Sequence, residues 1–504
     1  MNLLQMLSEA FSPDIVLLLM AGVCIGIIGG ALPGISSTTT AALMATFALT
    51  MDVTHAVMFM AATQVGSTYG GSISASILNI PGTPASAATA LEAYPMAQRG
   101  EGQKALAVNV MASFWGNTIG ALLLLVIFPL ALSLVLYFGS WEMFWFSIFG
   151  LVICAQLSRG DFKKGLLSAC LGLIFAFVGS DPIYGSGGMR FTLGIRALKD
   201  GIGLIPAMVG LYGMSEVFTT LTNGSAKPLP VKKDKLFAFK EIWKYKWTTL
   251  KVSVVGFLIG VVPGVGSNIA SWVGYSQAQS ASKNKEAFGT GCVEGLIGSE
   301  ASNNACAPGA YAPLLALGIP GDGITAIVLG VLTVQGVQTG ATFARNNPEF
   351  IYLLVLSILL AGAFFLLIGS FLCRPILKAL SAPLPIIMAT VICLCSMGAF
   401  SSASRESDII VMLVFGVIGL LMKKSKIPIA PMVLGLVVGR DLIDSNFCRA
   451  ILAGKGSLAP FFTRPFSLAL IALLLIVVLK DLLTPVMKRR KKNAANGAGA
   501  EKEE

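Results

Sequence analysis

Two Pro-Gly pairs in this sequence each end an apolar run and are followed by small polar side chains. They are Pro33, Gly34, Ser36, Ser37 and Thr38 in the first copy, and Pro263, Gly264, Ser267 and Asn268 in the second. Proline cannot donate a backbone hydrogen bond and glycine tolerates unusual dihedral angles, so we expect a helix to break at each pair. The polar side chains then cap the next helix beside free N–H groups. Because such a terminus attracts anions, both copies are candidate anion-binding elements, although a proline kink with ordinary capping is the alternative.

A second pair of Pro-Gly motifs follows polar stretches that are rich in small residues. The candidate substrate-binding residues there are Tyr69, Gly70, Gly71, Ser72, Pro81 and Gly82 in the first copy, and Asn303, Asn304, Pro320 and Gly321 in the second. Small residues also allow close helix packing, which is the competing interpretation. Polar groups within lipid are costly unless they have partners, so we expect these stretches to line a polar cavity.

Glu300 and Asp322 are acidic residues within the second set of motifs. A carboxylate inside a membrane is expensive and therefore suggests function, and we assign both residues as candidate sites for a coupling cation. Helix capping is an equal alternative for Asp322, which directly follows Pro320-Gly321. Weaker candidates are Glu92, Asp52 and Glu294. The single histidine, His55, begins an apolar run and is expected to be interfacial.

Several other chemistries are excluded by the residues that the sequence lacks. It has one histidine, no clustered cysteines beyond Cys393 and Cys395, and no Gly-Lys-Ser/Thr phosphate loop. A metal site, a zinc protease or an ATPase is therefore not expected, and we predict no cofactor. Energy for any uphill process would have to come from an ion gradient; the family resemblance described below implies Na⁺ or H⁺ as the coupling ion.

The elements that carry these residues are apolar segments of membrane-spanning character. The chain has 504 residues, of which 55% are hydrophobic and 12% charged, and its mean hydropathy is +0.79. That is too little charge to cover a soluble surface of this size. The net charge of +11 comes from Lys and Arg residues between apolar segments and at the C-terminus, which indicates membrane topology and not nucleic-acid binding. No Lys or Arg precedes the first apolar run, Ile15 to Leu32, so we expect a retained first helix and no cleavable signal peptide.

The predicted fold is an all-α polytopic membrane protein with about 12 transmembrane helices and some broken or re-entrant pieces. The expected apolar segments are 15–32, 38–50, 55–79, 105–137, 141–157, 165–180, 201–221, 248–262, 266–280, 290–318, 322–338, 349–373, 383–400, 407–422, 428–439 and 466–484.

Two homologous halves are expected from the repeated motifs. The first half is 1–222, with its repeat motif at about 26–83, and the second is 252–486, with its motif at about 256–322. Gly26 and Gly256 are 230 residues apart, whereas Pro81 and Pro320 are 239 apart, a difference that a short insertion explains. A basic cytoplasmic linker, 223–251, joins the halves, and a basic, disordered cytoplasmic tail, 487–504, ends the chain. An outside N-terminus would make the halves inverted.

The motifs in this order resemble the large membrane subunit of the tripartite tricarboxylate transporters, the TctA family. The resemblance runs from about Gly26 to Arg440 and rests on Gly-x-x-x-Gly-x-x-Pro-Gly in two copies, Tyr69-Gly-Gly-Ser72, Asn79-Ile-Pro-Gly-Thr83 and Gly318-Ile-Pro-Gly-Asp322. It implies a secondary transporter that works with a small four-helix membrane subunit and a periplasmic substrate-binding protein. It also implies citrate or a related carboxylate as the substrate.

The predicted function is cation-coupled uptake of a di- or tricarboxylate across a bacterial inner membrane, without enzymatic activity. The alternatives are an intramembrane enzyme, a passive channel and a sensor subunit for organic anions. No motif distinguishes citrate from tartrate or a phthalate-type acid, or Na⁺ from H⁺. Oligomeric state and the choice between rocking and elevator movement are equally open.

Overall fold

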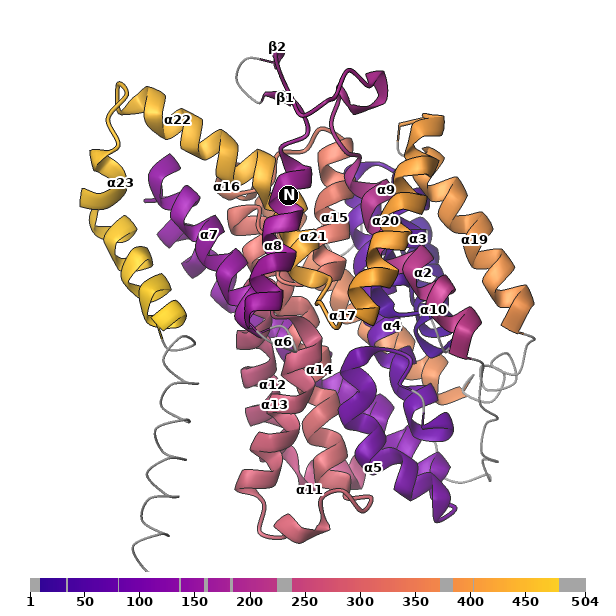
Figure 1. The fold of residues 1–504 in the computed structure, drawn as a ribbon. Coiled ribbons are helices and arrows are strands. Elements are labelled where there is room, and N and C mark those ends of the chain that lie inside the picture. Colours follow the sequence, from indigo (N-terminus) through magenta and orange to yellow (C-terminus); the bar gives the residue numbers. More distant parts are fainter. Residues whose placement is uncertain are drawn as a thin grey trace, which may run out of the picture.

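The computed structural model of the chain describes residues 10–32, 35–79, 81–135, 137–157, 162–181, 185–223, 238–371, 384–401 and 403–479. Pro33 and Gly34, residues 224–237 of the predicted linker and the whole predicted tail lie outside these ranges. Helices dominate the described chain, and they cluster into one body with α11 at one end and a short hairpin at the other (Figure 1).

The first part of the chain folds into long helices. Their bounds are α2 (Pro13–Ala31), α3 (Ser37–Ala48), α4 (Val53–Leu78), η1 (Pro84–Ser86), α5 (Ala87–Gln98), α6 (Gly102–Val135), α7 (Ser140–Leu157) and α8 (Phe162–Ala176). The expected segment 105–137 corresponds up to Val135 to a single helix, α6, despite Pro129 inside it. Helix α4 begins at an Asp52 cap and ends at Asn79, whose φ of 54° stops the helix in the left-handed region.

Further helices complete the part before the linker and start the part after it. Their bounds are η2 (Arg196–Leu198), α9 (Leu204–Met208), η3 (Val209–Met214), α10 (Ser215–Asn223), α11 (Phe239–Lys244), α12 (Lys246–Val261), α13 (Gly266–Ala281), η4 (Lys285–Ala287), α14 (Val293–Leu317) and α15 (Gly323–Val334). The expected segment 201–221 is interrupted by η3, a π-helical turn. Such turns are rare and frequently mark functional sites.

The remaining helices lie towards the C-terminus. They are α16 (Ala341–Asn346), α17 (Pro348–Phe371), α19 (Leu384–Ser401), α20 (Glu406–Lys424), α21 (Ala430–Val438), η5 (Gly439–Asp444), α22 (Ser445–Ala453) and α23 (Ala459–Thr463), followed by an apolar helix over Pro465–Leu479. Another π-helical turn, η5, follows α21.

A two-stranded antiparallel hairpin is the one departure from the all-helical prediction within the described residues. Strands β1 (Gly179–Asp181) and β2 (Gly185–Arg190) pair with Gly179 opposite Arg190. Glycine disfavours helix, and this stretch is rich in it, so the end of the segment predicted as helix over 165–180 instead enters the hairpin.

Three described helices are long and apolar enough to cross a membrane by length and composition, namely Pro13–Ala31, Gly102–Ser133 and Pro348–Phe371. Shorter apolar helices cover Ser140–Gln156, Leu204–Thr219, Gly323–Val334, Met388–Phe400 and Pro465–Leu479. The protein is therefore a helical membrane protein, and the count of about 12 spans stays a prediction.

Helix pairs α2–α4 and α12–α14 pack through glycine in the same way. In the first pair, a Cβ atom added at Gly26 would lie 2.5 Å from the Thr63 carbonyl oxygen, and one added at Gly30 would lie 2.2 Å from that of Ser67. In the second pair, a Cβ atom added at Gly256 would lie 2.2 Å from the Ser302 carbonyl oxygen, and one added at Gly260 would lie 2.2 Å from that of Cys306. The glycines are offset by 230 residues and their partners by 239, the offsets of the sequence motifs. Only glycine allows backbones to approach this closely.

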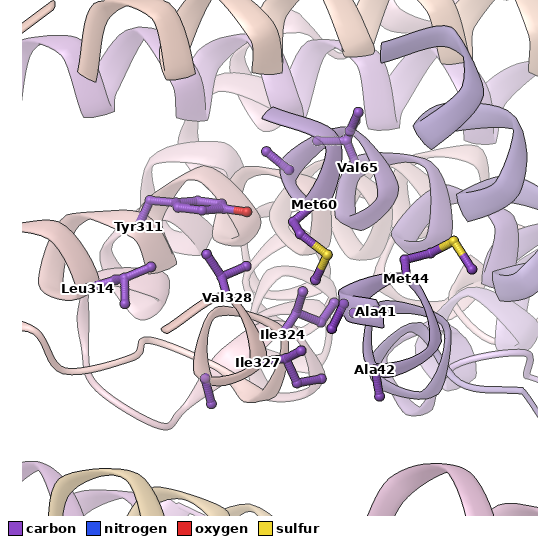
Figure 2. Close-up of a cluster of buried hydrophobic side chains, with 14 of the residues drawn as sticks. Ala41, Ala42, Met44, Met60, Val65, Tyr311, Leu314, Ile324, Ile327 and Val328 are labelled. Carbon is purple, nitrogen blue, oxygen red and sulfur yellow. The ribbon is translucent and has the colours of Figure 1, made fainter. Parts of the chain in front are cut away.

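Side chains from both parts of the chain share one core. Figure 2 shows Ala41 and Met44 of α3 and Met60 of α4 beside Ile324 and Val328 of α15. All five side chains are buried. The two predicted halves therefore do not form separate domains in this region.

Candidate functional site

A cavity of about 390 Å³ lies where residues from both sets of Pro-Gly motifs meet. We call it the central cavity. Its polar, charged and glycine lining residues are Ser36, Ser37, Thr38, Thr68, Thr83, Tyr212, Glu216, Gly264, Gly266, Ser267, Asn268, Asn303, Asp322, Gly323 and Lys423. The volume lies within the range of small-molecule sites.

Helices α3, α13 and α15 are three of the helices that begin at the central cavity and bring their N-termini to it. Helix α3 begins after Ser36, whose Oγ accepts a 3.1 Å hydrogen bond from Thr39 N. Helix α13 begins at Gly266 and α15 begins after Asp322. The first turns of all three line the cavity, which therefore collects free N–H groups and positive dipole ends from both predicted halves. This arrangement favours a bound anion.

Asp322 both caps α15 and faces the central cavity. Its Oδ1 accepts hydrogen bonds of 2.8 Å from Thr325 N and from Thr325 Oγ1. Its Oδ2 accepts a 2.9 Å hydrogen bond from Nε2 of Gln64 on α4. The capping interpretation is therefore correct for Asp322, and its place in the cavity leaves a role in cation binding open to it.

Asn303 presents a buried polar group to the central cavity. Its side chain is fully buried, and neither its amide nitrogen nor its amide oxygen has a hydrogen-bond partner among the described residues. A buried amide without a partner costs free energy, so this side chain is suited to a bound ligand.

Lys423 and Glu216 form an ion pair at the lining of the central cavity, and sequence reasoning missed both. Lys423 ends α20 and Glu216 begins α10, so each resembles an ordinary charged residue flanking an apolar helix. Tyr212 of η3 was also missed. Lys423 and Glu216 can be recognised only in the folded structure, which brings together two segments about 200 residues apart. Tyr212 could not be predicted because the interruption of the helix at η3 has no clear signal in the sequence.

Most of the other predicted substrate-binding residues pack helices and do not line the central cavity. Within the described residues these are Tyr69, Gly70, Gly71, Ser72, Pro81, Gly82, Pro263, Asn304, Pro320 and Gly321. A Cβ added at Gly70 would lie 2.4 Å from the Ile27 carbonyl oxygen, and the Tyr69 ring stacks on Phe365 at 5.3 Å. Close backbone contacts explain the glycines among them, and the predicted role of these residues in substrate binding stays a prediction.

Glu300 lies in a closed polar network behind the central cavity. Its carboxylate is fully buried and accepts hydrogen bonds from the hydroxyls of Ser72 (2.6 Å), Ser113 (2.8 Å) and Thr89. Asn304 donates to Ser113 Oγ and to the backbone oxygen of Glu300. The network joins α4, α5, α6 and α14, and among the described residues no lysine or arginine pairs with the Glu300 carboxylate.

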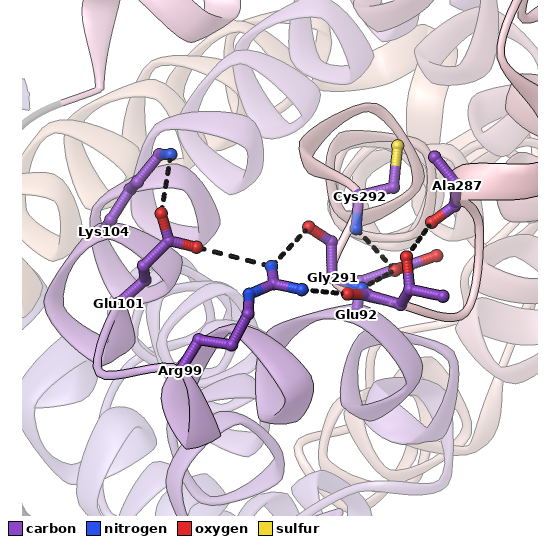
Figure 3. A network of polar contacts seen from close by, with 8 residues as sticks. Glu92, Arg99, Glu101, Lys104, Ala287, Gly291 and Cys292 are labelled. Atoms are coloured by element: carbon purple, nitrogen blue, oxygen red, sulfur yellow. Dashed lines mark hydrogen bonds and ion pairs between the residues drawn. The ribbon is translucent and has the colours of Figure 1, made fainter.

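Glu92, a weaker candidate, holds a loop in place. Its buried carboxylate accepts hydrogen bonds from Tyr275 Oη and from the backbone N–H groups of Gly289, Gly291 and Cys292, at 2.6 to 2.8 Å. Figure 3 shows Glu92 beside Gly291 and Cys292. Arg99 donates to the backbone oxygen of Gly291 beside it. These contacts fix α5 of the first half against the loop before α14, so the role of Glu92 is structural.

The remaining acids and the histidine also have local partners. Asp52 caps α4 and contacts His55, which reaches Asp14 at 3.4 Å. His55 is one-third exposed at the start of α4, in agreement with an interfacial position. Glu294 accepts hydrogen bonds from Thr248 and Ser282. None of these residues lines the central cavity.

Comparison with known proteins identifies the family. The sequence matches the family described as "Tripartite tricarboxylate transporter TctA family" over residues 16–434. The chain belongs to the TctA family. TctA proteins are transporter subunits and not enzymes, so the intramembrane-enzyme alternative is set aside.

Two relatives of this TctA-family chain come from Agrobacterium vitis. The "Uncharacterized 52.8 kDa protein in TAR-I ttuC' 3'region" is 31% identical over 493 residues, which are 97% of this chain and 98% of the relative. The "Uncharacterized protein in TAR-II ttuC' 3'region" is 30% identical over 235 residues, 47% of this chain and 97% of that relative. No solved structure matches this TctA-family chain.

Proposed function

We propose that this TctA-family protein moves a di- or tricarboxylate, citrate or a related acid, into the cell through the central cavity. Its transport would be coupled to Na⁺ or H⁺ across a bacterial inner membrane. The observation that carries the proposal is the convergence of the N-termini of α3, α13 and α15 on a cavity that also contains Lys423. Discontinuous helices with facing N-termini bind substrate carboxylates in many secondary transporters.

Lys423 supplies the positive charge that a carboxylate needs. In the structure it is paired with Glu216. A substrate carboxylate takes the place of the Glu216 carboxylate at the ammonium group, while the hydroxyls of Ser36, Ser37 and Thr38 and the groups of Ser267 and Asn268 donate hydrogen bonds. Hydrogen bonds between charged groups are about twice as strong as neutral ones.

Asp322 couples a cation to the anion through simple electrostatics. The charged residues that line the described cavity are Glu216, Asp322 and Lys423, so two negative charges face one positive charge. An ionised Asp322 repels a carboxylate, and a proton or Na⁺ at Asp322 removes that repulsion. The two ligands then strengthen each other's binding, as any mutual coupling requires. Glu300 is the second proposed coupling residue, acting in its own closed network.

Energy considerations also favour coupling. Carrying a trivalent anion into an inside-negative cell costs about 7 kcal/mol at 100 mV, from about 2.3 kcal/mol per charge. Three co-transported cations would cancel this electrical cost, and more would make uptake electrogenic. The proposed partners are a small four-helix membrane subunit and a periplasmic binding protein that delivers the carboxylate. The matched packing of α2–α4 and α12–α14 supports two homologous halves.

The proposal is tested by uptake of labelled citrate into proteoliposomes with imposed Na⁺ or H⁺ gradients. The liposomes contain this chain and the proposed small membrane subunit, with the proposed binding protein added. Concentrative uptake that collapses with one gradient supports the proposal and identifies the driver. Uptake that only follows the citrate gradient indicates a passive channel. Binding without any movement of citrate, tartrate or phthalate indicates a sensor subunit.

A further inference from the structure

A second and larger cavity, of about 650 Å³, lies at the far ends of helices that begin at the central cavity. We call it the arginine cavity, because Arg440 and Arg449 are the charged residues in its described lining. Hydrogen-bonding side chains accompany them, namely Gln338, Thr339, Thr342, Ser445 and Asn446. None of these residues belongs to the Pro-Gly motifs.

Two helices connect the two cavities. Helix α15 places Asp322 in the central cavity and Thr333 in the arginine cavity, eleven residues apart, which is about 16 Å along a helix. Helix α21 places Ala430 in the central cavity and Val437 in the arginine cavity. The two cavities are therefore neighbours along one direction of the molecule.

A short segment of chain, Gly318–Asp322, also lies between the two cavities. Gly318, which ends α14 with a φ of +72°, lines the arginine cavity, and four residues later Asp322 lines the central one. A Cβ added at Gly318 would lie 3.1 Å from Thr339 Oγ1. The Gly318–Asp322 segment thus forms part of the partition between the two cavities.

The arginines keep their charge available in the arginine cavity. Arg440 donates hydrogen bonds to Ser180 Oγ at 2.7 Å and to the Asp200 backbone oxygen, which are neutral partners. Arg449 is exposed and makes no ion pair among the described residues. Nearby carboxylates are engaged elsewhere, since Arg190 pairs with Asp181 and Asp444 and Arg405 pairs with Asp200 and Asp408.

The arginine cavity lies towards the end of the molecule that bears α16, α22 and the hairpin, whereas α11 lies at the opposite end (Figure 1). Helix α11 and its surroundings contain Lys240, Lys244 and Lys246, and such lysine clusters mark the cytoplasmic side. With the basic linker on the cytoplasmic side, as predicted, the arginine cavity faces away from the cytoplasm.

We propose that the arginine cavity is a second carboxylate site, which holds the incoming anion on the non-cytoplasmic side before it reaches the central cavity. This inference rests on the proposed transport function. Arg449 contacts the anion and Arg440, held by Ser180, orients it, because guanidinium groups bind carboxylates through paired hydrogen bonds. The volume accommodates a tricarboxylate together with water.

Equilibrium binding of radiolabelled citrate to the purified full chain in lipid nanodiscs tests this inference. We expect two citrates per wild-type chain. Arg449→Gln should weaken one of them about tenfold, which corresponds to about 1.4 kcal/mol, and Arg449→Glu should abolish it. Arg345→Glu is the matched control, because Arg345 is exposed on α16 close by but does not line the cavity, and it should retain both citrates.

Lys423→Gln separates this inference from the proposed function. If the wild-type chain binds one citrate that Lys423→Gln weakens and Arg449→Glu leaves unchanged, the second site is wrong and the proposed function stands. If it binds one citrate that is lost in Arg449→Glu alone, the arginine cavity is confirmed and the central site is wrong. If citrate, tartrate and phthalate all fail to bind to the wild-type chain, both proposals are wrong.

Discussion

The side-chain amide of Gln64 donates a 2.9 Å hydrogen bond to the carboxylate of Asp322, 258 residues further along the chain. Gln64 lies on α4 and Asp322 caps α15, so this contact joins the two sets of motifs at the central cavity. In the proposed coupling role, a proton or Na⁺ on Oδ2 of Asp322 would compete with the Gln64 amide for that oxygen. It would then alter the contact between α4 and α15 as well as the charge in the cavity.

Asp322→Asn should abolish net concentrative citrate uptake while leaving the protein folded, since asparagine also caps helices well. If the driver is H⁺, asparagine imitates the protonated carboxylate, and exchange of labelled for unlabelled citrate should continue. If the driver is Na⁺, exchange should fall as well. Uptake and exchange assays in the same proteoliposomes distinguish these results, and unchanged net uptake would contradict the role of Asp322.

Lys423→Gln should raise the KM for citrate about tenfold, because one charged hydrogen bond to the substrate is lost. The matched control is Lys424→Gln, which removes the same charge from the next residue, an exposed lysine outside the cavity lining. Its KM should change less than twofold. Equal KM values for the two variants would remove Lys423 from the substrate site.

Glu300→Gln tests the closed network behind the cavity. Glutamine fills the same space, but its NH₂ group cannot accept the hydrogen bonds that the Glu300 carboxylate receives, so we expect uptake to fall at least tenfold. Ser113→Ala is the comparison, because it removes one of the hydroxyl donors and keeps the acid. If Glu300 binds a coupling cation, Ser113→Ala retains dependence on the ion gradient and Glu300→Gln loses it. Full dependence in both variants would leave Glu300 a structural residue.

Glu92→Ala should lower the free energy of unfolding by about 3 kcal/mol, because three backbone N–H groups and the Tyr275 hydroxyl lose a buried charged acceptor. Glu101→Ala removes a half-exposed ion pair with Arg99 and Lys104 and should cost less than about 1 kcal/mol. Thermal unfolding in detergent compares them. Similar melting temperatures would show that the loop at Gly289 does not depend on Glu92.

Gly260→Ala should destabilise the protein by about 1–3 kcal/mol, since the added methyl group would lie 2.2 Å from the Cys306 carbonyl oxygen. Gly30→Ala should do the same at the equivalent place in the first half. Gly102→Ala is the control, because the nearest atom to its added Cβ is a flexible Ile77 methyl group at 3.4 Å. A larger loss of stability at Gly102 than at Gly260 would contradict the packing argument.

The class of fold could be predicted from the sequence because it depends on local signals. Apolar length predicts membrane helices, and Pro-Gly followed by small polar residues predicts a helix start, as observed at Ser37 and Gly266. The assignment of the substrate site stays a prediction. The TctA family could also be recognised from the order of the motifs.

The division of roles among the small polar residues could not be predicted. Tyr69 and Asn303 occupy similar polar stretches, yet Tyr69 stacks on Phe365 and Asn303 faces the cavity. The rotation of each helix about its own axis decides which side chains face the cavity. Because α4 and α14 are buried on all sides, their sequences have no amphipathic pattern from which this rotation could be predicted. Lys423 was missed for a different reason, since its partner Glu216 is brought to it only by the fold.

The glycine contacts between α2 and α4 and between α12 and α14 also have a mechanical consequence. Each carbonyl oxygen sits in a notch left by a missing Cβ, so sliding one helix along the other would drive backbone atoms into backbone atoms. Such a pair resists shear and moves as one rigid unit. Any motion that exposes the two cavities alternately is then expected to move such a pair as a unit and not to slide its two helices past each other.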